Sequence, residues 1–282
     1  MNRYKEHAAR LLFLICACVS IICVLLICLF LFANGLPTIA EIGPFKFLLG
    51  TRWKPGNDIF GIAPMIIGSL YVTAGAMAVG VPIGVLTAIF IARFGTKQVN
   101  RVLRPAVSLM AGIPSIIYGF FGLVVLVPLM RQLFNGGKSV MTASILLGIM
   151  ILPTVISVSE AAIAAVPESY YEGALALGAS HERSVFFVLL PAAKSGVMAA
   201  IVLGVGRAIG ETMAVIMVAG NQPVIPESIT SGVRTMTANI VIEMGYAADL
   251  HRGALIATGV VLFVFILLIN LLLSLIKRRQ NI

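Results

Sequence analysis

The chain has 282 residues, of which 60% are hydrophobic and 11% are charged, whereas about 25% of the residues in a soluble domain are charged. This composition excludes a soluble globular protein. It predicts an all-α polytopic membrane protein, because the apolar residues form several runs longer than the roughly 18 residues of a spanning helix. The net charge of +9 is better explained by basic residues that orient the chain in a lipid bilayer than by a nucleic-acid partner.

Six spans follow in chain order from the positions where charged residues stop, because an ionisable group in hydrocarbon is costly. The first run resembles a signal peptide but is too long for one, so we expect it to remain as a helix. Its four Cys residues match no zinc or haem spacing, and we expect neither a metal nor a cofactor. The expected spans are Leu11–Ala33, Gly61–Ala92, Pro105–Met130, Val140–Val166, Ala192–Gly220 and Gly253–Ile276.

The placement of Lys and Arg predicts the orientation of these spans. With the N-terminus inside, the inner segments hold twelve Lys and Arg residues and the outer segments hold seven, so both termini are predicted to be cytoplasmic. The outer segments Asn34–Phe60 and Asn221–Arg252 are rich in Gly, Pro and Asn and are expected to form short surface elements. Trp53, in the first of them, fits either the outer membrane interface or a surface that docks a partner.

Small residues recur four positions apart inside the spans, as in Gly80 with Gly84 and Gly206 with Gly210. This spacing is typical of close helix packing. Together with the Pro residues of the spans, it also fits broken helices that line a moving cavity. The sequence leaves both interpretations open.

Two charged residues, Arg207 and Glu211, lie within the fifth span at the i, i+4 spacing that places side chains on one helix face. Each costs about 2.5 to 3.5 kcal/mol at a helix centre, so both must face protein or water. Either they form an internal ion pair, or Arg207 is a positive site for an oxyanion and Glu211 holds the guanidinium when no solute is present. Glu160, near the inner end of the fourth span, fits either a pathway residue or a group of the inner gate.

The loop between the fourth and fifth spans predicts two short helices. Pro167 begins the first, Gly178 ends it, Ser180 caps the second, and Pro191 ends the run. Such a projection fits a groove on another protein. The run Gly136–Ser139 lacks the first glycine of a phosphate-binding loop, so the chain is not expected to be an enzyme, and any ATP hydrolysis is expected in a separate subunit.

This loop resembles the coupling loop of permease subunits of bacterial binding-protein-dependent ABC importers. Glu172, Ala174, Gly178, Leu190 and Pro191 match the signature E-A-A-x3-G-x9-I-x-L-P, in which Gly173 and Val188 replace an alanine and the isoleucine. The stretches 112–122, 150–154 and 206–221 are similar to phosphate importer permeases of the PstC type.

The resemblance implies a type I ABC importer permease fold in a bacterial inner membrane. Residues 1–60 would form the first helix and an outer segment, and residues 61–282 the permease domain with a coupling loop at 167–191. The implied partners are a second homologous permease, two copies of a cytoplasmic ATPase and an external phosphate-binding protein, and the implied function is phosphate import. The alternatives are sulfate or molybdate as the solute, a secondary transporter or channel that uses Arg207, Glu211 and Glu160 as an ion relay, and a membrane-bound scaffold.

Overall fold

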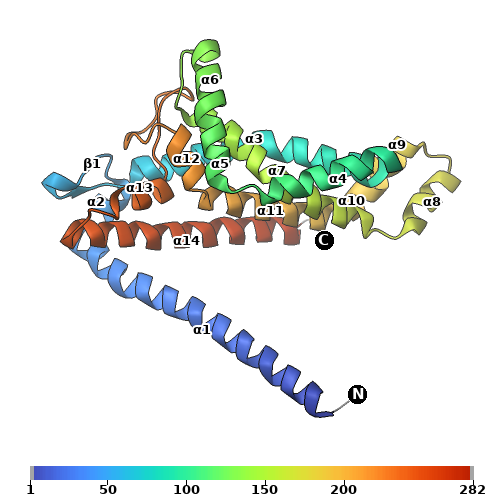
Figure 1. The fold of residues 1–282 in the computed structure, drawn as a ribbon, viewed down its shortest axis with the longest axis horizontal. Helices are drawn as coiled ribbons and strands as arrows, with labels where there is room; N and C mark the ends of the chain where they lie inside the picture. Colours follow the sequence, from blue (N-terminus) through green and yellow to red (C-terminus); the bar gives the residue numbers. More distant parts are fainter. Residues whose placement is uncertain (1–2, 280–282) are drawn as a thin grey trace.

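The computed structural model describes residues 3–279, and most of them belong to helices (Figure 1). Residues 1–2 and 280–282, the outermost ends of the expected 1–60 and 61–282 units, lie outside the described part of the chain. Two short strands form an antiparallel hairpin in which Trp53 lies opposite Phe60. The elements in chain order are α1 (Arg3–Ile42), α2 (Pro44–Leu49), β1 (Trp53–Lys54), η1 (Pro55–Asn57), β2 (Ile59–Phe60), α3 (Ala63–Ile89), η2 (Phe90–Phe94), α4 (Lys97–Gly112), α5 (Ser115–Phe121), η3 (Gly122–Leu126), α6 (Val127–Phe134), α7 (Val140–Ala164), α8 (Glu168–Ala176), α9 (His181–Ser184), η4 (Val185–Leu189), α10 (Leu190–Ala192), α11 (Lys194–Gly210), α12 (Met213–Val218), α13 (Met236–Glu243) and α14 (Asp249–Arg279).

The spans reach the predicted number of six when one bent helix pair is taken as a single crossing. The predicted all-α polytopic membrane fold is therefore confirmed, although several bounds differ. Within residues 3–279 the helices that are long and apolar enough to cross a membrane are Ala9–Ile42, Ala63–Phe94, Ser115–Phe134, Val140–Ala164 and Asp249–Leu272, and the bent pair joins His181–Ala192 to Lys194–Gly210 at 69°.

The predicted start of the third span at Pro105 is wrong. Pro105 lies inside α4, a separate amphipathic helix, and the membrane helix begins at Ser115. Between the two helices, Pro114 fixes its own φ and disfavours a helical conformation at the preceding Ile113, which is extended. Because apolar residues continue across this break, hydropathy alone does not reveal it.

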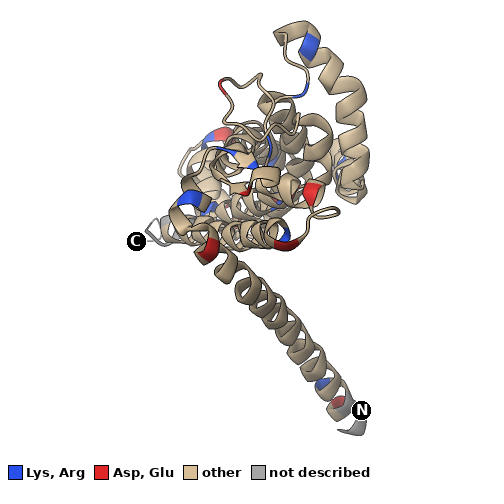
Figure 2. Cartoon of the chain, turned by 90° about the vertical axis from the view of Figure 1, so that its left-hand side faces the viewer, with Lys and Arg blue, Asp and Glu red and all other residues tan. Residues whose placement is uncertain are grey.

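The first span is longer than predicted. α1 continues past Ala33 to Ile42, and the side chains of Asn34 and Thr38 bond to carbonyls one turn earlier, so their polar groups are satisfied within the helix. α1 contacts α14, while its N-terminal half leaves the body of the molecule (Figure 1). The middle of α1 carries no Lys, Arg, Asp or Glu (Figure 2), as a helix exposed to lipid requires.

The centre of the molecule is formed by α3 packed along α7, with α11 against both. A Cβ added to Gly80 would lie 2.7 Å from the carbonyl oxygen of Gly148, and a Cβ on Gly84 would lie 2.8 Å from a methyl group of Val155. The interpretation of Gly80 and Gly84 as a close-packing pair is therefore confirmed.

The second pair behaves differently. A Cβ added to Gly206 or Gly210 would meet nothing within 4 Å. Close packing is therefore the wrong interpretation of this pair within the chain, and the surface around it is open.

We expect Gly80→Ala to lower the free energy of unfolding by about 1–3 kcal/mol, because overpacking a tight interface displaces its neighbours. Thermal unfolding of the purified chain in detergent would measure the loss. Gly206→Ala is the matched control, since its new methyl group meets open space and alanine favours a helix by about 1 kcal/mol over glycine. Equal melting temperatures for the two variants would contradict this description of the core.

The two ends of the molecule carry different elements (Figure 1). α8 and α9 lie at one end, toward which the C-terminal end of α14 points, and α2, the hairpin and α13 lie at the other. Following the charge-based orientation, we call these the inner end and the outer end. The two predicted outer segments do form short elements, except that Asn34–Ile42 continue α1. The Trp53 side chain is buried within the protein with 5% of its surface exposed, so it faces neither lipid nor a docked partner.

Candidate solute pathway and coupling loop

Arg207 lies next to a break in the predicted fifth span Ala192–Gly220, of which α11 forms the first part. α11 ends at Gly210, and Glu211 is extended (φ −71°, ψ 131°) before α12 begins at Met213. Arg207 belongs to the last turn of α11, and its Nη1 donates a hydrogen bond to Oγ1 of Thr154 on α7 at 3.1 Å. Within residues 3–279 its guanidinium forms no ion pair. A neutral hydroxyl therefore holds this cation in place.

The predicted placement of Arg207 and Glu211 on one helix face is wrong. Because the helix ends at Gly210, Glu211 is not one helical turn further along. Its Oε1 instead accepts a hydrogen bond from the backbone N–H of Ala214 at 3.2 Å. The carboxylate therefore satisfies an amide at the start of α12, as a helix cap does, and it does not hold the guanidinium.

A second break lies close to the first. α5, the first part of the third span, follows the extended pair Ile113 and Pro114 and packs against α12. Gly119 permits this contact, since a Cβ there would lie 2.9 Å from the Cα of Ala214. The buried Tyr118 spans its own break by donating its hydroxyl to the carbonyl of Met110 at 2.9 Å. The starts of the two half-helices therefore lie side by side.

The face that carries both breaks is open to the surroundings. A Cβ added to Gly112, Gly206 or Gly210 would meet nothing within 4 Å, and Met213 exposes 43% of its surface. Arg207 is half-buried. The helix is interrupted directly before the third span and again after α11. The interpretation of these breaks as the lining of a moving cavity stays a prediction.

Glu160 pairs with α4 and not with Arg207. Its Oε1 lies 2.8 Å from Nε of Arg104, and the two side chains expose 19% and 58% of their surfaces. Arg104 follows Lys97 and Arg101 at the spacing that places all three on one face of α4. Of the two interpretations of Glu160, this contact favours a group of the inner gate.

The inner loop folds largely as its sequence predicts. α8 begins directly after Pro167, Gly178 follows its end with a φ of +83°, and the Ser180 hydroxyl caps α9. A φ of this sign favours glycine, because other L-residues meet their own backbone there. The expected end at Pro191 is one residue early, since helical residues continue to Ala192.

The predicted coupling residues are spread along this loop. Leu177, between them, exposes 91% of its surface, which suits a projection that inserts into a partner. Glu172 is exposed and Ala174 half-buried on α8, Gly178 is exposed at the turn, Leu190 is half-buried, and Pro191 is exposed.

Tyr171 of α8 turns inward and connects the loop to the second span. Its hydroxyl forms a hydrogen bond with Nδ1 of His181 at 2.8 Å. Arg93 of η2 lies over the Tyr171 ring, 5.8 Å from its centroid, and pairs with Glu168 at 2.8 Å. The ring of Phe94 meets the ring of His181 edge-on at 4.6 Å. The sequence gives no sign of this cluster beyond a basic residue at the end of a span.

The chemical groups at the breaks are the Arg207 guanidinium, the hydroxyls of Thr154 and Tyr118, and the Glu211 carboxylate, which accepts a hydrogen bond from the backbone of α12. Within the described residues, no three His, Cys, Asp or Glu side chains are placed to hold a metal, and the four Cys residues are free.

Relatives of known class match most of the chain. The family model described as "Binding-protein-dependent transport system inner membrane component" matches residues 80–282. The chain is 38% identical to the probable ABC transporter permease protein YqgH of Bacillus subtilis (strain 168), over 97% of this chain and 92% of that protein. It is 34% identical to the phosphate transport system permease protein PstC of Mesorhizobium japonicum, over 85% of this chain and 80% of that protein. It is 32% identical to the probable phosphate transport system permease protein PstC of Methanocaldococcus jannaschii, over 86% and 84%.

Solved structures of transporters share the fold. A chain of a bacterial alginate ABC transporter, in complex with an alginate pentasaccharide-bound periplasmic protein, aligns with a TM-score of 0.67 at 18% identity, covering 99% of this chain and 98% of that chain. A chain of the MetNI methionine ABC transporter in an inward-facing conformation aligns with a TM-score of 0.58 at 22% identity, covering 78% and 94%.

The bundle of spans, the two breaks and the inner loop together define a membrane permease. The chain belongs to the family of inner-membrane components of binding-protein-dependent transport systems, and it is an ABC transporter permease. The resemblance to PstC-type permeases, the ABC importer permease fold and the multi-pass inner-membrane location are confirmed.

Proposed function

We propose that the chain is the permease subunit of an ABC importer for inorganic phosphate and forms half of the translocation pathway. The observation that carries this proposal is Arg207, a cation within a span that lies next to a helix break and is held by the hydroxyl of Thr154. Ionisable groups inside spans most often mark a solute path. The planar donors of a guanidinium match the oxygens of phosphate.

The names of the relatives support phosphate as the solute. The proteins from Mesorhizobium japonicum and Methanocaldococcus jannaschii are both named as phosphate permeases, whereas the name of the Bacillus subtilis protein gives no solute. Sulfate and molybdate present similar oxygens to a guanidinium, so they are the alternative solutes for the same site.

The partners follow from the open face and the inner loop. A second homologous permease would supply the wall that faces Arg207, and a phosphate-binding protein would deliver the solute at the outer end. Two copies of a cytoplasmic ATPase would hydrolyse ATP and bind one loop from each permease. In this chain the loop lies at 167–191 within a permease domain of residues 61–282, and its contact residues would be Glu172, Ala174, Gly178, Leu190 and Pro191.

The mechanism is alternating access driven from the inner end. Closure of the two ATPases moves α8 and α9, and the Arg93–Glu168 ion pair carries this motion to the second span, which packs along α7. Opening at the outer end then exposes Arg207 to phosphate. Because solute transfer requires weak binding, the guanidinium must release phosphate when the inner end opens.

Co-purification in mild detergent followed by uptake in proteoliposomes tests the proposal. A companion permease and an ATPase should co-elute, and vesicles that contain the complex, ATP inside and the binding protein outside should accumulate phosphate. Accumulation of sulfate or molybdate instead would assign a different solute but leave the chain an ABC importer permease. Uptake by the isolated chain under a pH gradient would refute the proposal.

Gly178→Leu is expected to lower ATP-driven uptake while the chain still reaches the membrane. Leucine at a φ of +83° is strained by roughly 1–2 kcal/mol, so the turn between α8 and α9 must change shape. Uptake and ATPase binding would be measured on the same preparation. Gly173→Ala is the control, because its Cβ meets open space on α8; if Gly178→Leu transported as well as this control, the coupling role of the turn would be wrong.

A further inference from the structure

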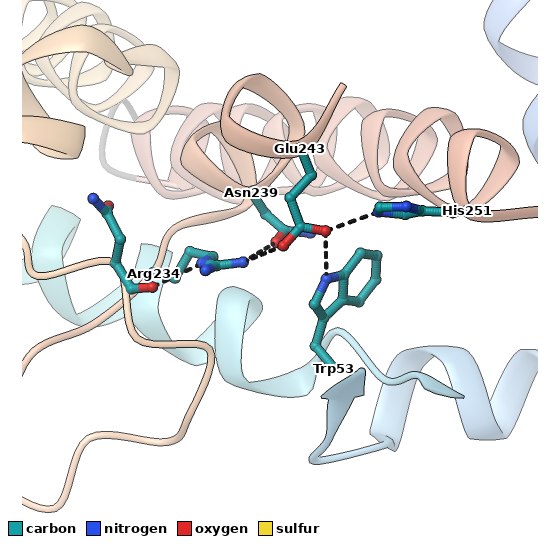
Figure 3. Close-up of polar contacts among 6 residues, drawn as sticks. Trp53, Arg234, Asn239, Glu243 and His251 are labelled. Atoms are coloured by element: carbon teal, nitrogen blue, oxygen red, sulfur yellow. Dashed lines mark hydrogen bonds and ion pairs between the residues drawn. The ribbon is translucent and has the colours of Figure 1, made fainter. Parts of the chain in front are cut away.

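Segments far apart in the sequence meet at one carboxylate at the outer end of the molecule. The side chains of Trp53, Arg234 and His251 point toward Glu243 (Figure 3). Trp53 Nε1 donates to Glu243 Oε2 at 2.8 Å, Arg234 Nη1 lies 2.6 Å from Glu243 Oε1, and His251 Nε2 lies 2.8 Å from Oε2. We call these four residues the Glu243 cluster. It joins the hairpin, the segment before α13, the end of α13 and the first turn of α14.

The Glu243 cluster is buried, so its hydrogen bonds and ion pairs are costly to break. Glu243 exposes 5% of its surface and Trp53 also 5%, and a buried carboxylate is tolerated only while its donors remain in place. Arg234 also donates its Nε to the carbonyl of Asn221 at 2.9 Å, so the segment after α12 is tied to the cluster. Partial burial raises the pKa of the Tyr246 hydroxyl, and the Glu243 carboxylate raises it further while Arg234 opposes this.

The other end of α13 is tied to the break in the fifth span. Thr237 Oγ1 donates to the carbonyl oxygen of Glu211 at 3.2 Å, and the N–H of Met236 donates to Ser69 Oγ of α3 at 3.0 Å. Glu211 is the extended residue of the break and follows Arg207 by four positions. α13 therefore runs from the Glu243 cluster to the break, with a polar contact at each end.

We propose that α13 is a strut that sets the position of the fifth-span break. The Glu243 cluster fixes its outer end, and Thr237 transfers that position to Glu211. Trp53 and Thr237 are then positioning residues for the transport step, although neither touches the solute. The role of α13 in transport rests on the proposed function. Its role in positioning the break concerns this chain alone.

The position of the break can be measured without transport. Gly210 borders the break, is exposed, and has open space at its Cβ, so Gly210→Cys in a chain whose four native Cys residues are replaced by Ser provides a label site. The rate of its reaction with a membrane-impermeant thiol reagent reports how accessible the break is. We expect Thr237→Val and Trp53→Phe each to change this rate about threefold or more.

A double variant tests whether the two residues act through one element. If two substitutions act independently, the fold-changes that they cause in the labelling rate multiply. If both act through the same strut, the fold-changes do not multiply. We expect Thr237→Val with Trp53→Phe to change the rate no more than the larger single change. A product of the two single changes, or no change in either single variant, would overturn the proposal.

Thr258→Val is the matched control. Thr258 is buried and donates its hydroxyl to the carbonyl of Ala254 one turn earlier in α14. The variant therefore removes a threonine hydroxyl, as Thr237→Val does, but at a position outside α13. Its labelling rate should equal that of the parent, and an equal change would show general loosening and overturn the strut. In the reconstituted complex, Thr237→Val should also lower the phosphate imported per ATP hydrolysed. A parent complex that imports no oxyanion would refute the proposed function and leave the labelling result intact.

Discussion

Arg207→Gln is expected to lower ATP-driven phosphate uptake roughly 10- to 100-fold. A hydrogen bond to a charged group contributes about 1.5–3 kcal/mol, and each 1.4 kcal/mol is about a factor of ten. Glutamine keeps N–H donors and removes the charge, and α11 still packs against α7 through its other residues. Initial rates of phosphate uptake into proteoliposomes would measure the effect.

Arg207→Lys is the matched control, because it keeps the charge and loses the planar fork of donors. We expect its uptake to lie between those of the parent and the glutamine variant. Full uptake by Arg207→Gln would remove the main support for an anion pathway. Loss of the companion permease or the ATPase from the purified complex would assign Arg207 a structural role instead.

Glu243→Ala is expected to lower the free energy of unfolding by about 3–5 kcal/mol, because removing one partner of a buried ion pair leaves the other charge uncompensated. The stranded group is Arg234, whose side chain exposes 13% of its surface. Trp53 is the single tryptophan of the chain, and it would lose its hydrogen-bond acceptor. Thermal unfolding in detergent would measure the stability, and a red shift of the Trp53 emission would report the loosened hairpin.

Two further substitutions serve as an intermediate case and as a control for Glu243→Ala. Glu243→Gln retains an oxygen that accepts from Trp53 but loses the charge that balances Arg234, so a smaller loss is expected. Glu227→Ala changes an exposed carboxylate of the same outer segment and should leave the melting temperature within about 1 °C, since substitutions at the surface usually cost less than 0.5 kcal/mol. A melting temperature for Glu243→Ala equal to that of Glu227→Ala would contradict a stabilising role for the cluster.

The fold could be predicted to the level of its spans because hydropathy reports burial in lipid directly. Hydropathy reveals less about where the backbone departs from the helix. At Gly112 to Pro114 the chain leaves the helix while its residues stay apolar, and at Gly210 to Thr212 it leaves the helix beside one charged residue, Glu211. The i, i+4 spacing of Arg207 and Glu211 assumed a continuous helix, and the pairing failed for that reason.

The inner loop could be predicted well because its signals are local. A proline before α8, a glycine with positive φ and a capping serine each act within a few residues. The Glu243 cluster could not be predicted in the same way. Trp53 and Glu243 are 190 residues apart in the chain, and nothing in the neighbourhood of either residue specifies the other.

The hydrogen bond between Arg207 and Thr154 has a consequence for how the proposed pathway would transfer an anion. A guanidinium carries five N–H donors, and Thr154 accepts from one of its nitrogens. In the proposed pathway, an arriving oxyanion would bind the other donors before the hydrogen bond to Thr154 breaks, and that hydrogen bond would form again before the anion leaves. The guanidinium would then keep a hydrogen-bond acceptor throughout, which would lower the barrier to both exchanges.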